Sequence, residues 1–92
     1  MKVNVRILGE LSSKLGRRKT LTLEEGSTVN TLVNSLSEEK SQNRQGHLGR
    51  YKISEGELAV LVNGKNIALL EGVKTILQDG DNVAFIPPAA GG

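Results

Sequence analysis

The sequence predicts an α+β domain in which a mixed sheet of four to five strands is covered on one face by one main helix. Two early segments alternate apolar and polar residues with the period of a half-buried strand, and residues 28–40 carry an apolar stripe with the period of a helix. Further strand patterns follow after residue 57. A chain of 92 residues, 37% hydrophobic and 24% charged, suits one domain of this kind.

The first two strands are predicted at residues 2–7 and 19–24. Gly9 ends the first segment, and a polar connection leads to the second. Both segments alternate, so we expect them to pair as a hairpin. Their apolar positions are Val3, Val5, Ile7, Leu21 and Leu23.

The main helix is predicted at residues 28–40, where apolar residues recur at i, i+3, i+4 and i+7. Ser27 or Thr28 can cap its first turn. A helix of this length is marginal by itself in water, so packing against the sheet must hold it. The apolar stripe consists of Val29, Leu32, Val33 and Leu36.

Residues 41–57 are mostly polar and contain three glycines, which predicts a loop or short irregular turns. Only Leu48, Tyr51 and Ile53 are candidates for anchoring this segment to the core. Loops of this kind often determine which partner binds.

Residues 58–62 are almost wholly apolar and predict a strand that is central or covered on both faces. Asn63-Gly64 favours a tight turn, after which residues 65–70 are expected to return as a short strand. Residues 73–77 can form one helical turn.

A turn signal at residues 79–81 precedes the last predicted strand, residues 82–86. Two strands, a crossing helix and further strands give a β-grasp arrangement in which the first and last strands are adjacent and parallel. We expect this domain to occupy residues 1–86 and a flexible tail to follow it at residues 87–92.

The tail is built for presentation to another protein. Its two prolines fix φ and lack an N–H group, so the chain cannot continue pairing and projects as a stiff stalk. The two alanines and two glycines beyond carry almost no side chain, so a narrow tunnel can close around the backbone. These residues are Pro87, Pro88, Ala89, Ala90, Gly91 and Gly92.

The terminal carboxylate of Gly92 is inert until its oxygen becomes a good leaving group, which an acyl-adenylate supplies. The sequence has no phosphate-binding G-x-x-x-x-G-K-[ST] loop and no cysteine to receive an acyl group. We therefore expect activation by a separate enzyme and no catalytic residues in this chain. A Gly-Gly end can also be simple disorder, but the prolines and the preceding strand make that interpretation the weaker one.

Residues 79–92, DGDNVAFIPPAAGG, resemble the C-terminus of the MoaD/ThiS family of ubiquitin-like sulfur carriers. This family includes the small subunit of molybdopterin synthase and the archaeal ubiquitin-like small modifier proteins. The order of elements and the Val62-Asn63-Gly64 turn also agree with the family. Ala89-Ala90 stands where Val-Ala is more frequent, and Asn82 where an acidic residue is common.

The resemblance implies that an adenylating enzyme of the ubiquitin-activating type, MoeB/ThiF-like, uses ATP and magnesium on Gly92. A sulfur donor then forms a thiocarboxylate, and the chain itself binds no cofactor. The sulfur would go to molybdenum-cofactor biosynthesis, through a MoaE-like large synthase subunit, or to tRNA thiolation. Phe85 and Ile86 are candidates for a partner interface, and Phe85 could equally belong to the core.

Two alternatives remain open at this point. The chain could be a protein modifier of the archaeal type, joined through Gly92 to lysines of target proteins by an isopeptide bond. It could also be a β-grasp binding module that never uses its terminus chemically.

Composition argues against other classes of function. There is no cysteine, so disulfides and thiolate metal sites are absent from the sequence, and no acidic cluster suggests a metal site. A net charge of +2 with 2% aromatic residues gives little support for direct nucleic-acid binding. No apolar run could span a membrane and no signal segment is evident, so we expect a cytoplasmic, monomeric protein.

Two polar features remain to be placed. His47 is expected to be a solvated loop side chain. The basic run Arg17-Arg18-Lys19 is expected at a turn, as a solvated edge that discourages aggregation or, alternatively, as a docking site for acidic partners.

Overall fold

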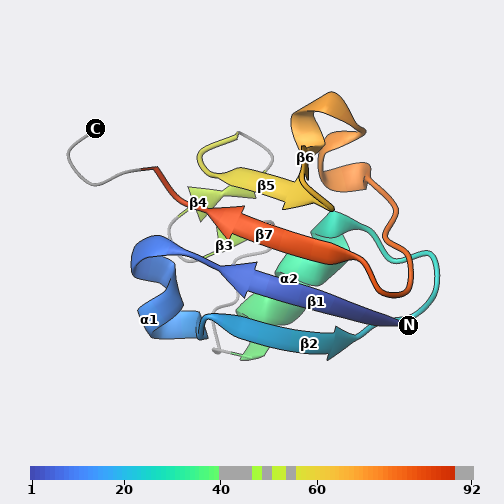
Figure 1. Cartoon of the computed structure of the whole chain (residues 1–92), viewed down its shortest axis with the longest axis horizontal. Coiled ribbons are helices and arrows are strands. Elements are labelled where there is room, and N and C mark those ends of the chain that lie inside the picture. The colour runs from blue at the N-terminus through green and yellow to red at the C-terminus, as the bar shows by residue number, and fades with distance from the viewer. Residues whose placement is uncertain (40–46, 49–50, 54–55, 89–92) are drawn as a thin grey trace.

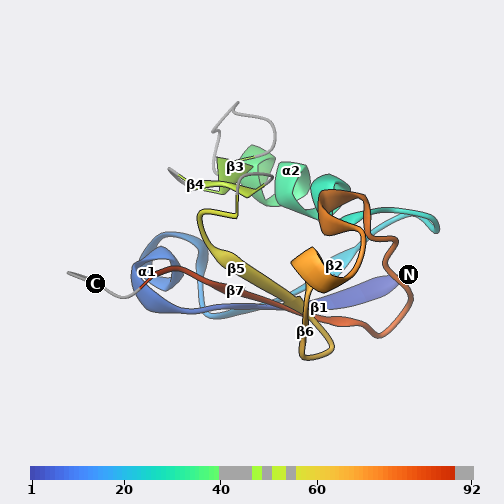
Figure 2. The same cartoon turned by 90° about the horizontal axis from the view of Figure 1, so that it is seen from above.

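The computed structural model describes residues 1–39, 47–48, 51–53 and 56–88. A five-stranded mixed sheet forms one layer, and helix α2 (Val29–Glu39) crosses one face of it (Figure 1). Figure 2 shows α2 and a small second sheet on the same side; no described element covers the opposite, open face. This is the β-grasp arrangement that the order of elements predicts. No helix in the described part of the chain is long and apolar enough to cross a bilayer.

The strand order across the sheet is β2-β1-β7-β5-β6. β1 pairs antiparallel with β2 and parallel with β7, while β5 pairs antiparallel with both β7 and β6. The strands are β1 (Lys2–Ile7), β2 (Arg18–Thr22), β5 (Ala59–Val62), β6 (Lys65–Asn66) and β7 (Asn82–Ile86).

The parallel pairing of the first and last strands is confirmed. Asn4 lies opposite Asn82, and Ile7 opposite Phe85. Because β1 and β5 flank it, β7 is the central strand of the sheet. The C-terminal tail therefore leaves the sheet from its central strand.

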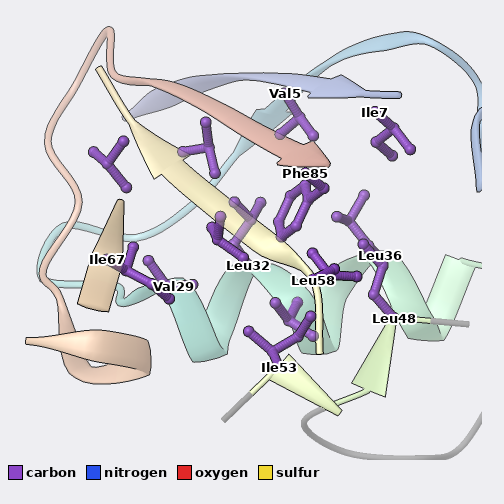
Figure 3. Close-up of a cluster of buried hydrophobic side chains, with 14 of the residues drawn as sticks. Val5, Ile7, Val29, Leu32, Leu36, Leu48, Ile53, Leu58, Ile67 and Phe85 are labelled. Carbon is purple, nitrogen blue, oxygen red and sulfur yellow. The ribbon is translucent and has the colours of Figure 1, made fainter. Parts of the chain in front are cut away.

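The core lies between the sheet and α2. All four residues of the predicted helical stripe are fully buried, and Figure 3 shows the Phe85 ring pointing from β7 toward the side chains of α2. Thr28 caps the helix, since its Oγ1 accepts a hydrogen bond from the N–H of Thr31 at 3.3 Å. Packing and capping together account for a helix too short to be stable alone.

The connection between β1 and β2 is more ordered than predicted. It contains a 3-10 turn, η1 (Gly9–Leu11), followed by a short helix, α1 (Ser12–Leu15). Leu11 and Leu15 are both buried, and their i, i+4 spacing places them on one side of this turn. Two apolar residues among polar ones gave too short a pattern to predict a helix.

The prediction of a loop or short irregular turns at residues 41–57 holds at residues 53 and 56–57 but is wrong at residues 47–48 and 51–52, which are strands. β3 (His47–Leu48) and β4 (Tyr51–Lys52) form a small antiparallel sheet beside α2. The three predicted anchors, Leu48, Tyr51 and Ile53, are confirmed as buried. Two-residue strands are too short to show an alternating pattern.

The prediction of a central strand is confirmed by β5, which is internal in the sheet; its residues are alternately buried and half-exposed, so only one face is covered. Two predictions about the segments that follow need correction. The return strand stops at Asn66, whose side chain accepts a hydrogen bond from the N–H of Ala68 at 2.9 Å and starts η3 (Ile67–Leu69). The expected helical turn is a 3-10 turn, η4 (Gly72–Lys74).

The turn between β5 and β6 is confirmed. Asn63 and Gly64 both have positive φ, 51° and 86°, as the Asn-Gly pair predicts.

Candidate functional site

The candidate site begins where β7 ends, at Ile86. Both ends of this strand are fixed by hydrogen bonds. Near its end, the N–H of Leu8 donates to the carbonyl oxygen of Phe85 at 3.0 Å. At its start, the side-chain oxygen of Asn63 accepts from the N–H of Asn82 at 2.9 Å. The strand that leads into the tail is thus held firmly in register.

Gly9 lies against the first residue of the tail. A Cβ atom at this position would be 2.7 Å from Cγ of Pro87, closer than real Cβ atoms approach other heavy atoms. Gly9 also has a φ of +67°, which side chains with a Cβ rarely adopt. Both facts favour glycine here. The bend after β1 thereby supports the proline ring, and we call the contact between Gly9 and Pro87 the tail root.

The tail root is connected to the segment beside α2. The hydroxyl of Tyr51 donates a hydrogen bond to Oε1 of Glu10, the residue that follows Gly9. Tyr51 is buried, so this bond forms in a partly buried setting. β4 is therefore linked to the turn that supports Pro87.

The exposure of the tail residues changes quickly along the chain. Pro87 is half-buried against Gly9, whereas Pro88 is exposed. Ala89, Ala90, Gly91 and Gly92, which include the predicted reacting position, lie outside the described residues. The structure therefore places the base of the stalk, and the role of Gly92 stays a prediction.

Phe85 is not an interface residue. Its side chain is fully buried in the core, so the hypothesis that it contacts a partner is wrong and its alternative assignment to the core is correct. Ile86 is half-buried and lies on the open face, opposite Ala59. Adjacent residues of a strand point to opposite faces, so only Ile86 remains available to a partner.

The other polar candidates, His47, Arg18 and Lys19, lie in strands. No group of three or more histidine, aspartate and glutamate side chains that could hold a metal occurs among the described residues. His47 is half-buried in β3 and not in a solvated loop; its carbonyl accepts a hydrogen bond from Ser37. Arg18 and Lys19 belong to the edge strand β2 and not to a turn.

Two features of the tail root were missed from sequence alone. In the sequence Gly9 marks only the end of a strand, and the hydrogen bond between Glu10 and Tyr51 joins residues 41 positions apart. A glycine between a strand and a buried leucine pair signals a special backbone conformation, but it does not reveal what packs above it.

The sequence matches the ThiS family over residues 5–92, which includes the whole tail. This chain belongs to the ThiS family. Small archaeal modifier protein 3 of Haloferax volcanii is 32% identical over 97 aligned residues, covering 100% of both chains. A protein of Archaeoglobus fulgidus assigned as a sulfur carrier is 35% identical over 71 residues, 71% of this chain and 74% of that protein.

Two solved structures share the fold of this chain. The crystal structure of SAMP1 from Haloferax volcanii superposes with a TM-score of 0.77 at 20% identity, covering 100% of both chains. Subunit 1 of the molybdopterin-converting factor from Helicobacter pylori, solved in complex with subunit 2, gives a TM-score of 0.60 at 22% identity, also over 100% of both chains. The fold is the ubiquitin-like β-grasp.

Proposed function

We propose that this ThiS-family protein is a ubiquitin-like sulfur carrier that holds sulfur on its C-terminal carboxylate, at Gly92. The family match carries this conclusion because it runs through the complete Pro-Pro-Ala-Ala-Gly-Gly tail. The fold supports it, since the tail starts from the central strand and is braced at Pro87.

The chemistry takes place on a partner enzyme. The Gly92 carboxylate attacks the α-phosphorus of ATP, whose magnesium ion is held by that enzyme, and pyrophosphate leaves. The resulting acyl-adenylate loses AMP when a sulfide-level donor attacks the carbonyl carbon, which leaves a thiocarboxylate. This chain supplies the carboxylate and the slim approach to it, and the enzyme supplies the nucleotide site. A MoeB/ThiF-like enzyme fits this role, and the cytoplasm is where such ATP-dependent activation is expected.

The tail must reach into the partner. The four residues after Pro88 can span at most about 14 Å when fully extended. A misplacement of about 1 Å at a reacting atom can lower a rate roughly a hundredfold. The position of Pro87 is therefore important for delivering Gly92 to the nucleotide.

The partner that binds the thiocarboxylated carrier determines which molecule accepts the sulfur. The Helicobacter pylori relative is named as a subunit of molybdopterin-converting factor and forms a complex with the second subunit. By analogy, a MoaE-like subunit would take the tail of this chain and pass sulfur to a pterin precursor. Transfer toward tRNA thiolation is the other route open to the same thiocarboxylate.

The test of this function is an intact-mass measurement. The protein is incubated with the adenylating enzyme encoded in the same genome, ATP, magnesium and a sulfide donor. We expect the mass to rise by the difference between one sulfur and one oxygen atom, and only when ATP is present. An unchanged mass with an enzyme that adenylates another carrier would refute the proposal.

A second function is favoured by the full-length relative, which is named as a modifier protein. In that case the activated Gly92 forms an isopeptide bond with a lysine amine of a target protein. Lys74 is the last basic residue of the chain, so tryptic digestion of cell extract would then yield peptides that carry residues 75–92 as a branch on a lysine. A carrier without modifier activity gives the thiocarboxylate and none of these peptides.

A further inference from the structure

Two arginines face each other across neighbouring strands on the open face of the sheet. Arg6 of β1 and Arg18 of β2 are direct partners in the antiparallel register, and both side chains are exposed. Like charges directly opposite one another destabilise a sheet. No carboxylate in the described part of the chain is paired with either guanidinium. Glu10, the acidic residue nearest to Arg6 in sequence, accepts the hydrogen bond of Tyr51.

Protection of the sheet edge explains the charge of Arg18 but not that of Arg6. β2 is an edge strand, where a charged side chain such as Arg18 discourages pairing with another chain. β1 is an internal strand with a neighbour on both sides, so Arg6 protects no edge. The fold gains nothing from placing a second positive charge opposite the first.

The arginine pair continues into an apolar surface. The register aligns Arg6 with Ala84 of β7, and Ala84 with Leu61 of β5. Arg18, Arg6, Ala84 and Leu61 thus form one row across four strands of the open face, the side turned to the viewer in Figure 1. Half of the row is positively charged, and the other half is small and aliphatic.

This row lies in a groove that reaches the tail root. Arg6, Arg18, Leu61 and Ala84 all line one hollow of the open face. Arg6 and Arg18 also line a second hollow, together with Arg17 and Gly9. Pro87 follows Ala84 by three positions in the sequence, about 10 Å along a strand. A partner that grips the tail would therefore meet the arginine pair at the same time.

We propose that the row of Arg18, Arg6, Ala84 and Leu61, which we call the arginine row, docks an acidic segment of the enzyme that activates the tail. Carboxylates of that segment pair with the two guanidinium groups, and an aliphatic side chain lies on Ala84 and Leu61. Pairing with a carboxylate removes the repulsion that the free chain tolerates. This inference rests on the proposed function, because it assigns the partner of the same tail.

The surface suits a protein better than a nucleic acid. Arginine next to aliphatic side chains is typical of protein interfaces. Binding of single-stranded nucleic acid relies on aromatic side chains for stacking, and the single phenylalanine, Phe85, is buried in the core. The arginine row also offers only two positive charges, too few for an extended phosphate backbone.

A charge-reversal experiment tests the arginine row. The variant Arg6→Glu/Arg18→Glu keeps two like charges opposite each other, so we expect little change in Tm. With the adenylating enzyme of the same genome, KM for the carrier should rise at least about tenfold while kcat changes little. The KM of the natural chain should rise between about 0.05 and 0.5 M NaCl, and the variant should lack this dependence.

The matched control is Lys65→Glu/Lys74→Glu, which changes the net charge by the same amount. Both lysines are exposed, and the register places Lys65 on the face of Val62, away from the open face. The control should keep the KM of the natural chain. An equal rise of KM in both variants would show a general effect of net charge and overturn the assignment.

A single reversal separates docking from stability. Arg18→Glu places opposite charges across the strands, so Tm should increase by about 2 to 6 °C. The same variant should bind the enzyme more weakly. A variant that is more stable and binds as tightly as the natural chain would mean that the arginines are merely solvated.

Direct binding keeps this test independent of sulfur chemistry. Titrating the nitrogen-15-labelled chain with the enzyme should shift the resonances of Arg6, Arg18 and Ala84. Absence of binding, or shifts confined to other surfaces, overturns the docking proposal even where the mass test shows a thiocarboxylate. Shifts at the arginine row without thiocarboxylate support the docking and refute the carrier function. Binding of purified tRNA that the double reversal abolishes would replace the protein partner by a nucleic acid.

Discussion

Gly9 and Pro87, 78 positions apart in the sequence, are in direct contact, and a Cβ atom on Gly9 would come within 2.7 Å of the proline ring. The contact exists because β1 and β7 run parallel, so both strands end at the same edge of the sheet. The residue that terminates the first strand thus supports the first residue of the tail. Replacing it should change where the tail points.

The variant Gly9→Ala should therefore impair activation of the tail more than it impairs folding. Alanine at a φ of +67° is strained by about 1 to 2 kcal/mol, and its methyl group must also displace Pro87. We expect a Tm lower by several degrees and kcat/KM for adenylation lower by about tenfold or more. Pyrophosphate exchange and thermal unfolding measure the two effects.

Gly72→Ala is the matched control for this variant. Gly72 has a similar φ of +59°, but a Cβ there would meet no heavy atom within 4 Å. It should show the loss of stability without the loss of activation. Pro87→Ala added to Gly9→Ala should restore part of the activity, because the clash is relieved while the backbone strain remains. If Gly72→Ala lowers activation equally, the tail root has no special role.

The regular elements could be predicted because their patterns are long. The alternation of β1 and the stripe of α2 each extend over six residues or more, and β7 begins and ends where the sequence predicted. The turn at Asn63-Gly64 could be predicted because few residue pairs adopt two positive φ angles. In these places the local preference and the fold agree.

The remaining features depend on contacts between distant residues. β3 and β4 have two residues each, so their pairing is visible only once Leu48 and Tyr51 are seen packed beside α2. The opposition of Arg6 and Arg18 depends on the register of a hairpin, which a slip of one residue would abolish. The sequence pointed to the tail of the candidate site, but not to the surfaces around its base.

Phe85 and Ile86 should separate stability from partner binding. Phe85→Leu removes part of a fully buried ring and should lower the free energy of unfolding by about 1 to 2 kcal/mol, with KM for activation unchanged. Ile86→Ala, at a half-buried position on the open face, should lower stability less and raise KM several-fold. Urea unfolding and steady-state kinetics distinguish the two. A rise in KM for Phe85→Leu at a temperature where it is fully folded would contradict the assignment of Phe85 to the core alone.

The hydrogen bond between Tyr51 and Glu10 should hold β4 to the tail root. Tyr51→Phe keeps the buried ring and removes the donor to a carboxylate, so we expect a loss of about 1 to 3 kcal/mol in the free energy of unfolding. Amide hydrogen exchange should become faster at Leu11 and at Lys52, near the two ends of the lost contact. Glu10→Gln, which keeps an acceptor oxygen, should be milder. If Tyr51→Phe left the free energy of unfolding and the amide exchange unchanged, the packing of the ring, and not the hydrogen bond, would connect these segments.

Deletion of Gly92 should abolish sulfur loading and leave the fold intact. Among the described residues the buried core ends at Phe85 of β7, seven residues before the deleted glycine, so we expect Tm to stay within about 1 °C of the natural value. The deletion moves the terminal carboxylate by one residue, up to about 3.6 Å, which is far beyond the tolerance of a reacting atom. Intact mass after incubation with enzyme, ATP and sulfide should therefore show no thiocarboxylate. Pro88→Ala retains the length of the tail and should still be loaded. Loading of the shortened chain as fast as the natural one would mean that the activating enzyme accepts a carboxylate at variable positions. The support of Pro87 by Gly9 would then serve no purpose in catalysis.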